Sequence, residues 1–415
     1  MDALTTPSNW QRVRLGDIAT FLKGKGLSKS QVSSNAKHEC ILYGELFTYY
    51  DRVITNIKNF TNIYNNPILS LSNDVLMSGS AETPDILATA SCILKEGVIL
   101  GGDILIIRPN SNLLSGCFLA YCIVCDKNQV LSKVVGSTVY HLYAKDLKDF
   151  EIFLPPLNEQ IAIANILSDL DHYLYTLDAL ILKKESVKKA LSFELLSQRK
   201  RLKGFNQAWQ RVRLGDICEF GNGGAYETLI IENGNFKLIS LNSIDIDGNL
   251  KNTMKRVNFY DNSLKQDDIV MVLSDVAHGD FLGLCAVIPS NDYVLNQRMG
   301  RLRIRNDCIN ILFLRLYINA NQKYFKMQGQ GSSQLNLSKK AIEDFETPLP
   351  PLNEQIAIAN ILSALDHEII SLKNKKRQFE NIKKALNHDL MSAKIRVLKN
   401  KDCIKRGSLC NPCKA

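Results

Sequence analysis

The sequence predicts an α+β protein with two similar α/β domains joined by two long antiparallel helices. The helices should form a coiled coil, and a pseudo-two-fold axis should relate the two copies. Two repeats carry this prediction. The fifteen letters LPPLNEQIAIANILS occupy residues 154–168 and return unchanged at residues 349–363. WQRVRLGDI occupies residues 10–18 and returns at residues 209–217. Because internal repeats mark units that are built alike, the order of tryptophan box, variable region, proline box and helix predicts one fold used twice.

Length and composition agree with several soluble domains. A chain of 415 residues is too long for one ordinary core. Its 45% hydrophobic and 22% charged residues are typical of globular proteins. Apolar runs are interrupted by charge and the first residues resemble no signal peptide, so we expect a cytoplasmic protein without a membrane span. The expected boundaries are 1–153 for the first domain, 154–203 for the first helix, 204–348 for the second domain, 349–393 for the second helix and 394–415 for a basic, flexible tail.

The variable regions read as mixed strands and helices. Strand composition or alternation is found at residues 103–109, 267–274 and 301–305, and helices are expected at residues 117–126 and 310–320. The strand order cannot be derived from these patterns.

Each proline box opens a long helix, since a proline pair suits a first helical turn. Apolar residues then recur at alternating spacings of four and three, which is typical of a coiled-coil seam. Gly204 is the expected stop of the first helix. An antiparallel pair would place the two domains at opposite ends of a rod, and pairing between two molecules stays open. The expected seam residues are Ile163, Leu167, Leu170, Leu174, Leu177, Ile181, Val187, Leu191 and Leu195, and then Ile358, Leu362, Leu365, Ile369, Leu372, Lys376, Ile382, Leu386 and Leu390.

The net charge of +9 permits a polyanionic partner. The excess is concentrated at residues 183–190, 199–204 and 373–380 and in the tail. DNA repeats its recognition faces about every 34 Å, so two unlike domains on a fixed spacer would suit two half-sites separated by a gap. Identical proline boxes beside unlike domains suggest two docking places for one other protein. A recent duplication without functional demand is the alternative.

The chain carries no recognisable catalytic apparatus. Its Pro-Pro pairs lie only within the two proline boxes, so the base-holding box of an adenine methyltransferase is missing. The glycine-rich stretch at residues 220–224 reads as a turn, and no phosphate loop is present. Six scattered histidines offer no metal set, and Cys403, Cys410 and Cys413 read as a loose tail. We therefore expect no catalytic residue, no metal and no cofactor in this chain.

The doubled order of tryptophan box, variable domain, LPPLNEQ and heptad helix resembles the specificity subunit of type I restriction–modification systems, from residue 10 to about residue 390. The resemblance implies two target-recognition domains, each reading one half of a bipartite DNA sequence. It also implies two methyltransferase (modification) subunits that use S-adenosylmethionine, and motor–nuclease (restriction) subunits that use ATP and magnesium. The tail after residue 393 is a departure from that pattern.

Base reading needs polar side chains on an edge that can enter a groove. An ordinary surface loop is the alternative for each candidate. The candidate DNA-binding residues of the first domain are Lys23, Lys25, Ser28, Lys29, Tyr43, Glu45, Thr48, Ser78, Ser80, Thr83, Thr138 and Tyr140. Those of the second domain are Asn222, Tyr226, Asn242, Ser274, His278, Gln297, Arg298, Ser333, Gln334 and Asn336.

Six residues of the repeated boxes are candidates for contact with a partner protein. They are Trp10, Trp209, Glu159, Gln160, Glu354 and Gln355. Core packing of the tryptophans and helix-start polarity of the others are the alternative explanations. Two other functions remain open: the recognition subunit of a combined methylase–nuclease, and a coiled-coil scaffold that binds no DNA.

Overall fold

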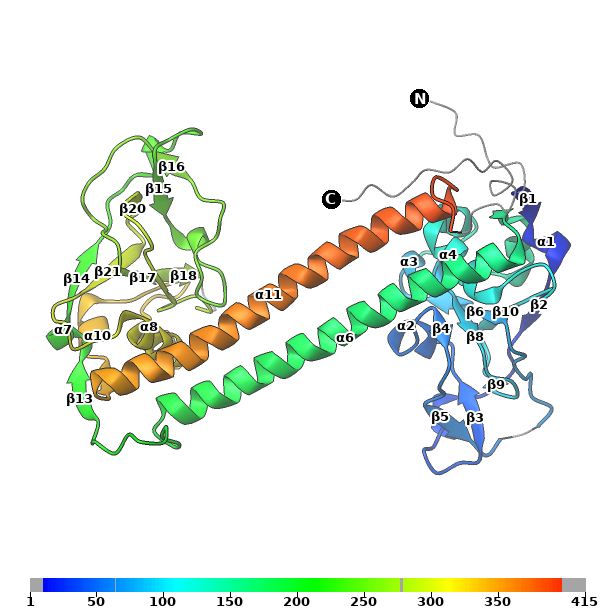
Figure 1. Ribbon diagram of the computed structural model, residues 1–415, viewed down its shortest axis with the longest axis horizontal. Helices are drawn as coiled ribbons and strands as arrows, with labels where there is room; N and C mark the ends of the chain where they lie inside the picture. Colours follow the sequence, from blue (N-terminus) through cyan, green and yellow to red (C-terminus); the bar gives the residue numbers. More distant parts are fainter. Residues whose placement is uncertain (1–9, 64, 277–278, 398–415) are drawn as a thin grey trace, which may run out of the picture. The chain divides into compact units, whose positions relative to one another are not determined.

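The computed structural model describes residues 10–63, 65–276 and 279–397 (Figure 1). The chain divides into two compact units, one made of Met1–Ala179 and Asn374–Ala415 and the other of Leu180–Lys373. Each unit therefore combines one domain with part of each long helix, α6 (Leu157–Leu196) and α11 (Leu352–Met391).

The first unit is built on a five-stranded sheet in the order β2-β10-β6-β8-β4. Neighbouring strands are antiparallel except β4 and β8, which are parallel. The bounds are β2 Ala19–Lys23, β10 Ile104–Pro109, β6 Asp74–Ser78, β8 Ser91–Ile93 and β4 Val53–Ile54. A three-stranded sheet adds β5 (Asn59–Thr61), β3 (His38–Ile41) and β9 (Ile99–Leu100). Two ribbons pair β1 (Gln11–Arg14) with β12 (Glu151–Leu154), and β7 (Ser80–Ala81) with β11 (Tyr140–His141).

The second unit repeats this plan with a four-stranded antiparallel sheet in the order β14-β21-β17-β19. The bounds are β14 Cys218–Asn222, β21 Met299–Ile304, β17 Ile269–Val272 and β19 Cys285–Val287. The smaller sheet holds β16 (Arg256–Val257), β15 (Phe236–Ile239) and β20 (Tyr293–Leu295). The ribbons pair β13 (Gln210–Arg213) with β23 (Glu346–Leu349), and β18 (Ser274–Val276) with β22 (Gln334–Asn336).

Short helices close each domain. In the first unit they are α1 (Leu15–Ile18), α2 (Glu45–Thr48), α3 (Pro84–Leu87), α4 (Gly116–Cys125) and α5 (Lys127–Leu131), with 3-10 turns at Lys29–Gln31 and Ala144–Asp149. In the second they are α7 (Leu214–Ile217), α8 (Ile311–Ala320), α9 (Gln322–Gln328) and α10 (Lys339–Glu343), with 3-10 turns at Glu227–Leu229 and Leu241–Ser243. The strands and helices predicted at residues 103–109, 117–126, 267–274, 301–305 and 310–320 are confirmed as β10, α4, β17, β21 and α8.

Buried apolar side chains hold the helices of each domain against its sheet. In the first unit the helix α4 is buried along most of its length and packs against β6 and β8. Phe118 of α4 and Val75 of β6 belong to one core with Ile163 and Leu167 at the start of α6. Each fully buried side chain of this kind contributes about 1.5–3 kcal/mol through the hydrophobic effect. The long helix is therefore part of the domain core as well as a connection.

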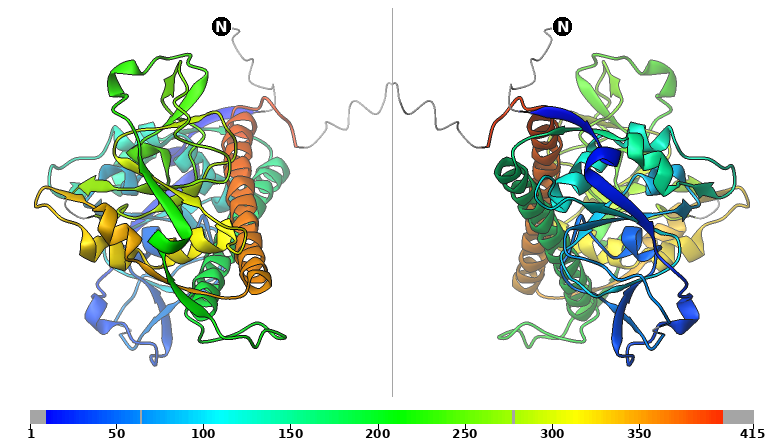
Figure 2. Two further views of the ribbon diagram at one scale, coloured as in Figure 1. Left: turned by 90° about the vertical axis from the view of Figure 1, so that its left-hand side faces the viewer. Right: turned by 90° about the vertical axis from the view of Figure 1, so that its right-hand side faces the viewer.

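The two long helices pair in antiparallel fashion, and both views in Figure 2 show them side by side. In the first unit, Asp171 and Asp178 of α6 form ion pairs with Lys383 and Lys376 of α11. In the second unit, Lys188 and Lys184 of α6 pair with Asp366 and Glu368 of α11. In each unit the partner's number falls as the residue number on α6 rises, which defines the antiparallel direction.

The predicted seam is right for most of its length and wrong at two equivalent positions. Side chains such as Leu177 and Ile369 are buried as expected. Val187 is 40% exposed and Ile382 is 49% exposed. An α-helix has about 3.6 residues per turn, so a strict seven-residue repeat drifts around the helix and the predicted stripe leaves the contact at these positions.

The ends of the two helices are built alike. Each helix is followed by a residue in the left-handed backbone region, Gln198 (φ 61°) after α6 and Ala393 (φ 56°) after α11, as is common at helix C-termini. The expected stop at Gly204 is therefore wrong, because the helix already ends at Leu196. The turn brings Arg201 back to the start of the opposite helix, and Arg396 occupies the equivalent place.

These two arginines form bidentate ion pairs with buried glutamates. Arg201 donates to Glu354 at 3.1 and 2.6 Å, and Arg396 donates to Glu159 at 2.6 and 2.8 Å. The glutamate side chains are 0% and 2% exposed. Because a carboxylate near a helix N-terminus also meets the positive end of the helix dipole, each pair fastens the end of one helix to the start of the other.

We expect R201M to lower the melting temperature by about 10 °C. Removing one partner of a buried ion pair leaves the other charge uncompensated and costs about 3–5 kcal/mol, and each kcal/mol shifts the melting temperature by about 2–4 °C in a unit of this size. Thermal unfolding followed by circular dichroism measures the shift. The matched control is K203M, an exposed lysine of the same linker. Equal melting temperatures for the two variants would contradict the role given to Arg201.

Candidate nucleic-acid interface and docking surface

The identical glutamines of the two proline boxes hold the domains on the helices. The Gln160 side chain donates to the carbonyl oxygens of Leu113 and Pro155, and its Oε1 accepts from the Ser115 amide at 2.8 Å. Ser115 is the N-cap residue of α4. The Gln160 side chain therefore ties the start of α6 to the start of α4.

Gln355 makes the same three bonds in the second unit. It donates to the carbonyl oxygens of Cys308 and Pro350 and accepts from the amide of Asn310, the N-cap residue of α8. Because both glutamines are fully buried, any change of length or chemistry would leave buried backbone groups unpaired. This requirement accounts for part of the identity between the two boxes.

The six side chains proposed as partner contacts are thus explained internally. Glu159, Gln160, Glu354 and Gln355 are buried and use their polar groups within the chain. Trp10 is 6% exposed and belongs to the first core, and Trp209 donates its indole N–H to Glu354 at 3.1 Å. We correct the expected partner contacts at these positions to structural roles, because their polar groups are already bonded or their surfaces already covered.

Each long helix also presents an equivalent exposed surface next to these residues. Ile161 is 46% exposed on α6, and the equivalent Ile356 is 40% exposed on α11. Leu352 is also exposed, at 39%. Identical isoleucines in the same exposed place, one turn after the helix start, form two copies of one apolar patch.

The candidate DNA-binding residues divide by burial. Glu45, Ser78, Ser80 and Ser274 are buried. Burial raises the pKa of the Glu45 carboxyl, which accepts hydrogen bonds from Leu42 and Asn59. The Ser78 hydroxyl donates to the Ser80 carbonyl oxygen at 2.7 Å, and the Ser274 hydroxyl donates to Asn336 at 2.6 Å. We correct these four to internal roles, because buried polar atoms that are bonded within the fold present no free edge.

The other candidates lie on or near the surface. Tyr140, Tyr226 and Gln334 are half-buried, and the Tyr226 hydroxyl donates to Asp261 at 2.8 Å. His278 lies outside the described residues. The exposed candidates are Lys23, Lys25, Ser28, Lys29, Tyr43, Thr48, Thr83 and Thr138 in the first unit and Asn222, Asn242, Gln297, Arg298, Ser333 and Asn336 in the second.

The structure brings several of the exposed candidates together at a site that we call the ribbon junction. It lies where the main sheet continues into the short ribbon, β7–β11 or β18–β22. In the first unit the Gly79 amide donates to the Asp103 carbonyl oxygen at 2.6 Å, and the Leu142 amide donates to that of Gly79 at 3.0 Å. In the second unit Leu273 donates to Arg298 at 3.1 Å, and Leu337 donates to Leu273 at 2.8 Å. The backbone frame is therefore the same in both units.

The first copy of the ribbon junction carries Lys23, Asp103 and His141. The Asp103 carboxylate accepts from Lys23 and from Ser80, both at 2.9 Å. The hydrogen bond from Lys23 lowers the pKa of the Asp103 carboxyl, so it remains an anion at neutral pH. His141 is exposed and lies opposite Ser80 in the ribbon.

The second copy carries Asn222, Arg298 and Asn336 at the equivalent positions. Asn222 ends β14 as Lys23 ends β2, and Asn336 lies opposite Ser274 in its ribbon. Arg298 replaces Asp103, is exposed, and has no acidic partner among the described residues. One backbone frame thus presents an acid–base pair in one unit and an exposed guanidinium with two amides in the other.

The candidate residues predicted from the sequence do not include Asp103 and His141, which lie at the ribbon junction. Asp103 was part of a stretch interpreted as a strand, although its positive φ of 63° after two glycines marks a turn. The glycine pair at residues 101–102 was the available signal, since turns with positive φ favour glycine, asparagine and aspartate.

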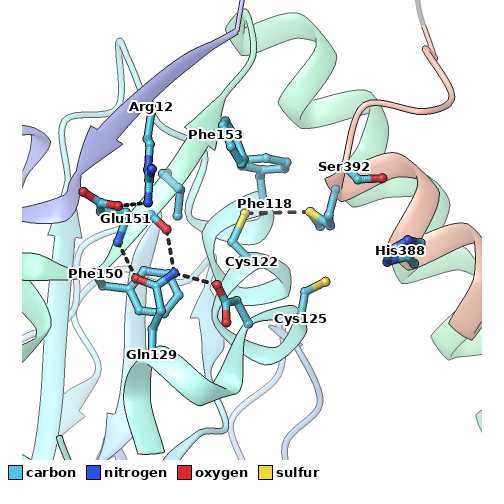
Figure 3. Close-up of a pocket in the computed structure, with 13 residues that line it drawn as sticks. Arg12, Phe118, Cys122, Cys125, Gln129, Phe150, Glu151, Phe153, His388 and Ser392 are labelled. Carbon is cyan, nitrogen blue, oxygen red and sulfur yellow. Dashed lines mark hydrogen bonds and ion pairs between the residues drawn. The ribbon is translucent and has the colours of Figure 1, made fainter. Parts of the chain in front are cut away.

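The first unit also contains a cavity of about 320 Å³ between α4, β12 and the end of α11 (Figure 3). Cys122, Cys125, Phe153 and His388 are among its lining residues. In the second unit Tyr317 stands at the position of Cys122 and packs into the core around Leu195 and Leu196. A smaller side chain at residue 122 therefore explains the cavity by packing. No group of three histidine, cysteine, aspartate or glutamate side chains suited to a metal occurs within the described ranges.

Nor does any helix in the described part of the chain have the length and apolar character needed to cross a membrane.

Comparison with known proteins identifies the same repeat. A sequence profile for the type I restriction modification DNA specificity domain matches residues 7–184 and again residues 206–381. The type I restriction enzyme MjaVIII specificity subunit of Methanocaldococcus jannaschii is 27% identical over 428 residues, covering 96% of this chain and 95% of that protein.

A solved structure shows the same fold. The crystal structure of the type-I restriction-modification system S subunit from M. genitalium matches with a TM-score of 0.67 at 19% identity. The match covers 94% of this chain and 98% of that chain. Together with the doubled profile, it confirms the predicted architecture of two similar domains with two long helices.

Proposed function

Because this chain belongs to the type I restriction modification DNA specificity family, and is therefore a non-catalytic specificity subunit, we propose that it recognises a bipartite, asymmetric DNA target with one domain for each part. The observation that carries the proposal is the ribbon junction. A shared backbone frame with different polar side chains is what two readers of different sequences require.

The chemistry of the second ribbon junction suits direct readout. An arginine can donate two hydrogen bonds to the O6 and N7 atoms of guanine, and an asparagine can bond adenine at N6 and N7. Arg298 and Asn336 are both exposed. The Asn336 amide accepts from Ser274 and donates to Gln334, which leaves one N–H and one lone pair of its oxygen for a base. In the first copy, the Lys23–Asp103 pair and His141 offer a different set, so the two domains would prefer different bases.

The proposal extends to partners. The two patches around Ile161 and Ile356 would each dock one methyltransferase subunit, which would bind S-adenosylmethionine and methylate adenine. Motor–nuclease subunits that use ATP and magnesium would join through these. Two identical apolar patches suit two copies of one partner, because each patch can bind the same surface of one copy.

We expect R298A to weaken binding to the target duplex by about 5- to 150-fold, since one bidentate base contact is worth about 1–3 kcal/mol. The duplex is first identified by mapping methylated adenines in DNA modified by the intact complex. Fluorescence anisotropy then compares this duplex with one scrambled in the half read by the second domain. The control is K340A, an exposed lysine of the same unit.

If Arg298 contacts a base, R298A loses affinity for the target duplex and loses little affinity for the scrambled duplex. Equal losses on both duplexes would mean a phosphate contact and would contradict the reading role. Wild-type protein that shows no salt-dependent binding to any duplex would contradict the proposed function itself and favour a protein scaffold.

We expect I161E and I356E each to remove one methyltransferase subunit from the complex, and the double variant to remove both. A buried glutamate would be charged and unpaired in an apolar interface. Native mass spectrometry of the co-expressed subunits counts the partners. L182E is the matched control, because Leu182 is 64% exposed on the same helix but its equivalent on α11 is Arg377. Full assembly in the double variant would contradict docking at these patches.

A further inference from the structure

The two long helices are equivalent position by position. Both contain 40 residues and both start at the same place in the proline box, so residue 157 of α6 corresponds to residue 352 of α11. In an antiparallel pair with a two-fold axis, each contact in one unit then has a counterpart in the other. Differences between counterparts show where the pairing depends on which helix is present.

The outer ion pairs are the same in both units. Asp171 of α6 pairs with Lys383 of α11, and the counterpart is Asp366 of α11 with Lys188 of α6. An α6 helix carries both Asp171 and Lys188, and an α11 helix carries both Asp366 and Lys383. These pairs would therefore form equally well between two copies of the same helix.

The inner ion pairs differ. Glu185 of α6 pairs with Lys373 of α11 at 2.8 Å, and Asp178 of α6 pairs with Lys376 of α11 at 2.6 Å. In both inner pairs α6 supplies the acid and α11 supplies the base, although the counterpart of Glu185 on α11 is also acidic, Glu380. On α6 the counterpart of Lys373 is Asp178, so the charge at this position is opposite on the two helices.

We propose that these inner charges make α6 pair with an α11 helix and reject the α6 helix of a second copy of the protein. If two α6 helices paired in the same register, Glu185 of each would face Asp178 of the other. If two α11 helices paired, Lys376 of each would face Lys373 of the other. Pairing of two α6 helices thus creates two like-charge contacts, a common means of setting partner choice in coiled coils. Pairing of two α11 helices also creates two, although Lys373 of each would face Glu380 of the other as well.

A neighbouring contact adds to this discrimination. Tyr173 of α6 packs against Phe379 of α11 with ring centroids 4.6 Å apart. The counterpart is the ion pair of Lys184 with Glu368 at 2.8 Å. Pairing of identical helices would set Tyr173 against Lys184 and Phe379 against Glu368, which loses both the aromatic contact and the ion pair.

Each surface ion pair is weak by itself, because the paired side chains are between 30% and 49% exposed. Discrimination comes from the difference between attraction in one pairing and repulsion in another. The apolar seam supplies stability to either pairing, and the inner charges choose between them.

The decisive variant is E185K in the full chain. Within one chain it sets the new side chain against Lys373, which is repulsive. Between two α6 helices it sets the new side chain against Asp178, which is attractive and occurs twice. We expect the wild type to be monomeric and E185K to self-associate about tenfold more tightly or better, as measured by analytical ultracentrifugation over a concentration series. Raising the salt from about 0.1 to 0.5 M should reduce the difference.

Two further variants complete the test. E185K/K373E restores an opposite-charge pair inside the chain, and we expect it to be monomeric again. K383D breaks an outer pair but is repulsive in either pairing, because it sets the new side chain against Asp171 or Asp366. We expect it to lower the melting temperature without self-association. An E185K protein that stays monomeric like K383D, or a double variant that still dimerises, would overturn the proposal.

Discussion

A buried glutamate at the start of each long helix, held by an arginine that follows the other helix, is the interaction on which the rest of the structure depends. Glu354 with Arg201 and Glu159 with Arg396 join each helix end to the opposite helix start. Gln355 and Gln160, the next residues along, fasten the domain beside them. One short sequence thus connects helix to helix and helix to domain. Because both ends of the helix pair need the same connection, the same residues occur twice.

Between these fixed points the two domains are free to differ. The ribbon junction keeps the same backbone hydrogen bonds in both units while its side chains change from Lys23 and Asp103 to Asn222 and Arg298. Under the proposed function, the repeated connection would fix the position of each reading surface and the variable edge would set its chemistry.

The repeat, the fold class and the long helices could be predicted because identical boxes and a regular apolar stripe are local features of the chain. The strand order could not, because pairings such as β4 with β8 join residues that no pattern links. Glu45 and Ser78 were predicted as DNA-binding residues but are buried, since the type of a polar residue does not reveal whether its hydrogen bonds lie inside the fold. The seam was wrong at Val187 and Ile382 because a strict heptad ignores the true helical period.

The central claim is that each domain reads its own part of one DNA target. The most direct measurement is methylation mapping after residues 19–150 are replaced by the corresponding region of a relative with a different target, in the otherwise intact complex. The account predicts a new sequence in one half of the methylated site, with the other half and the gap unchanged. A change in both halves, or in neither, would contradict it.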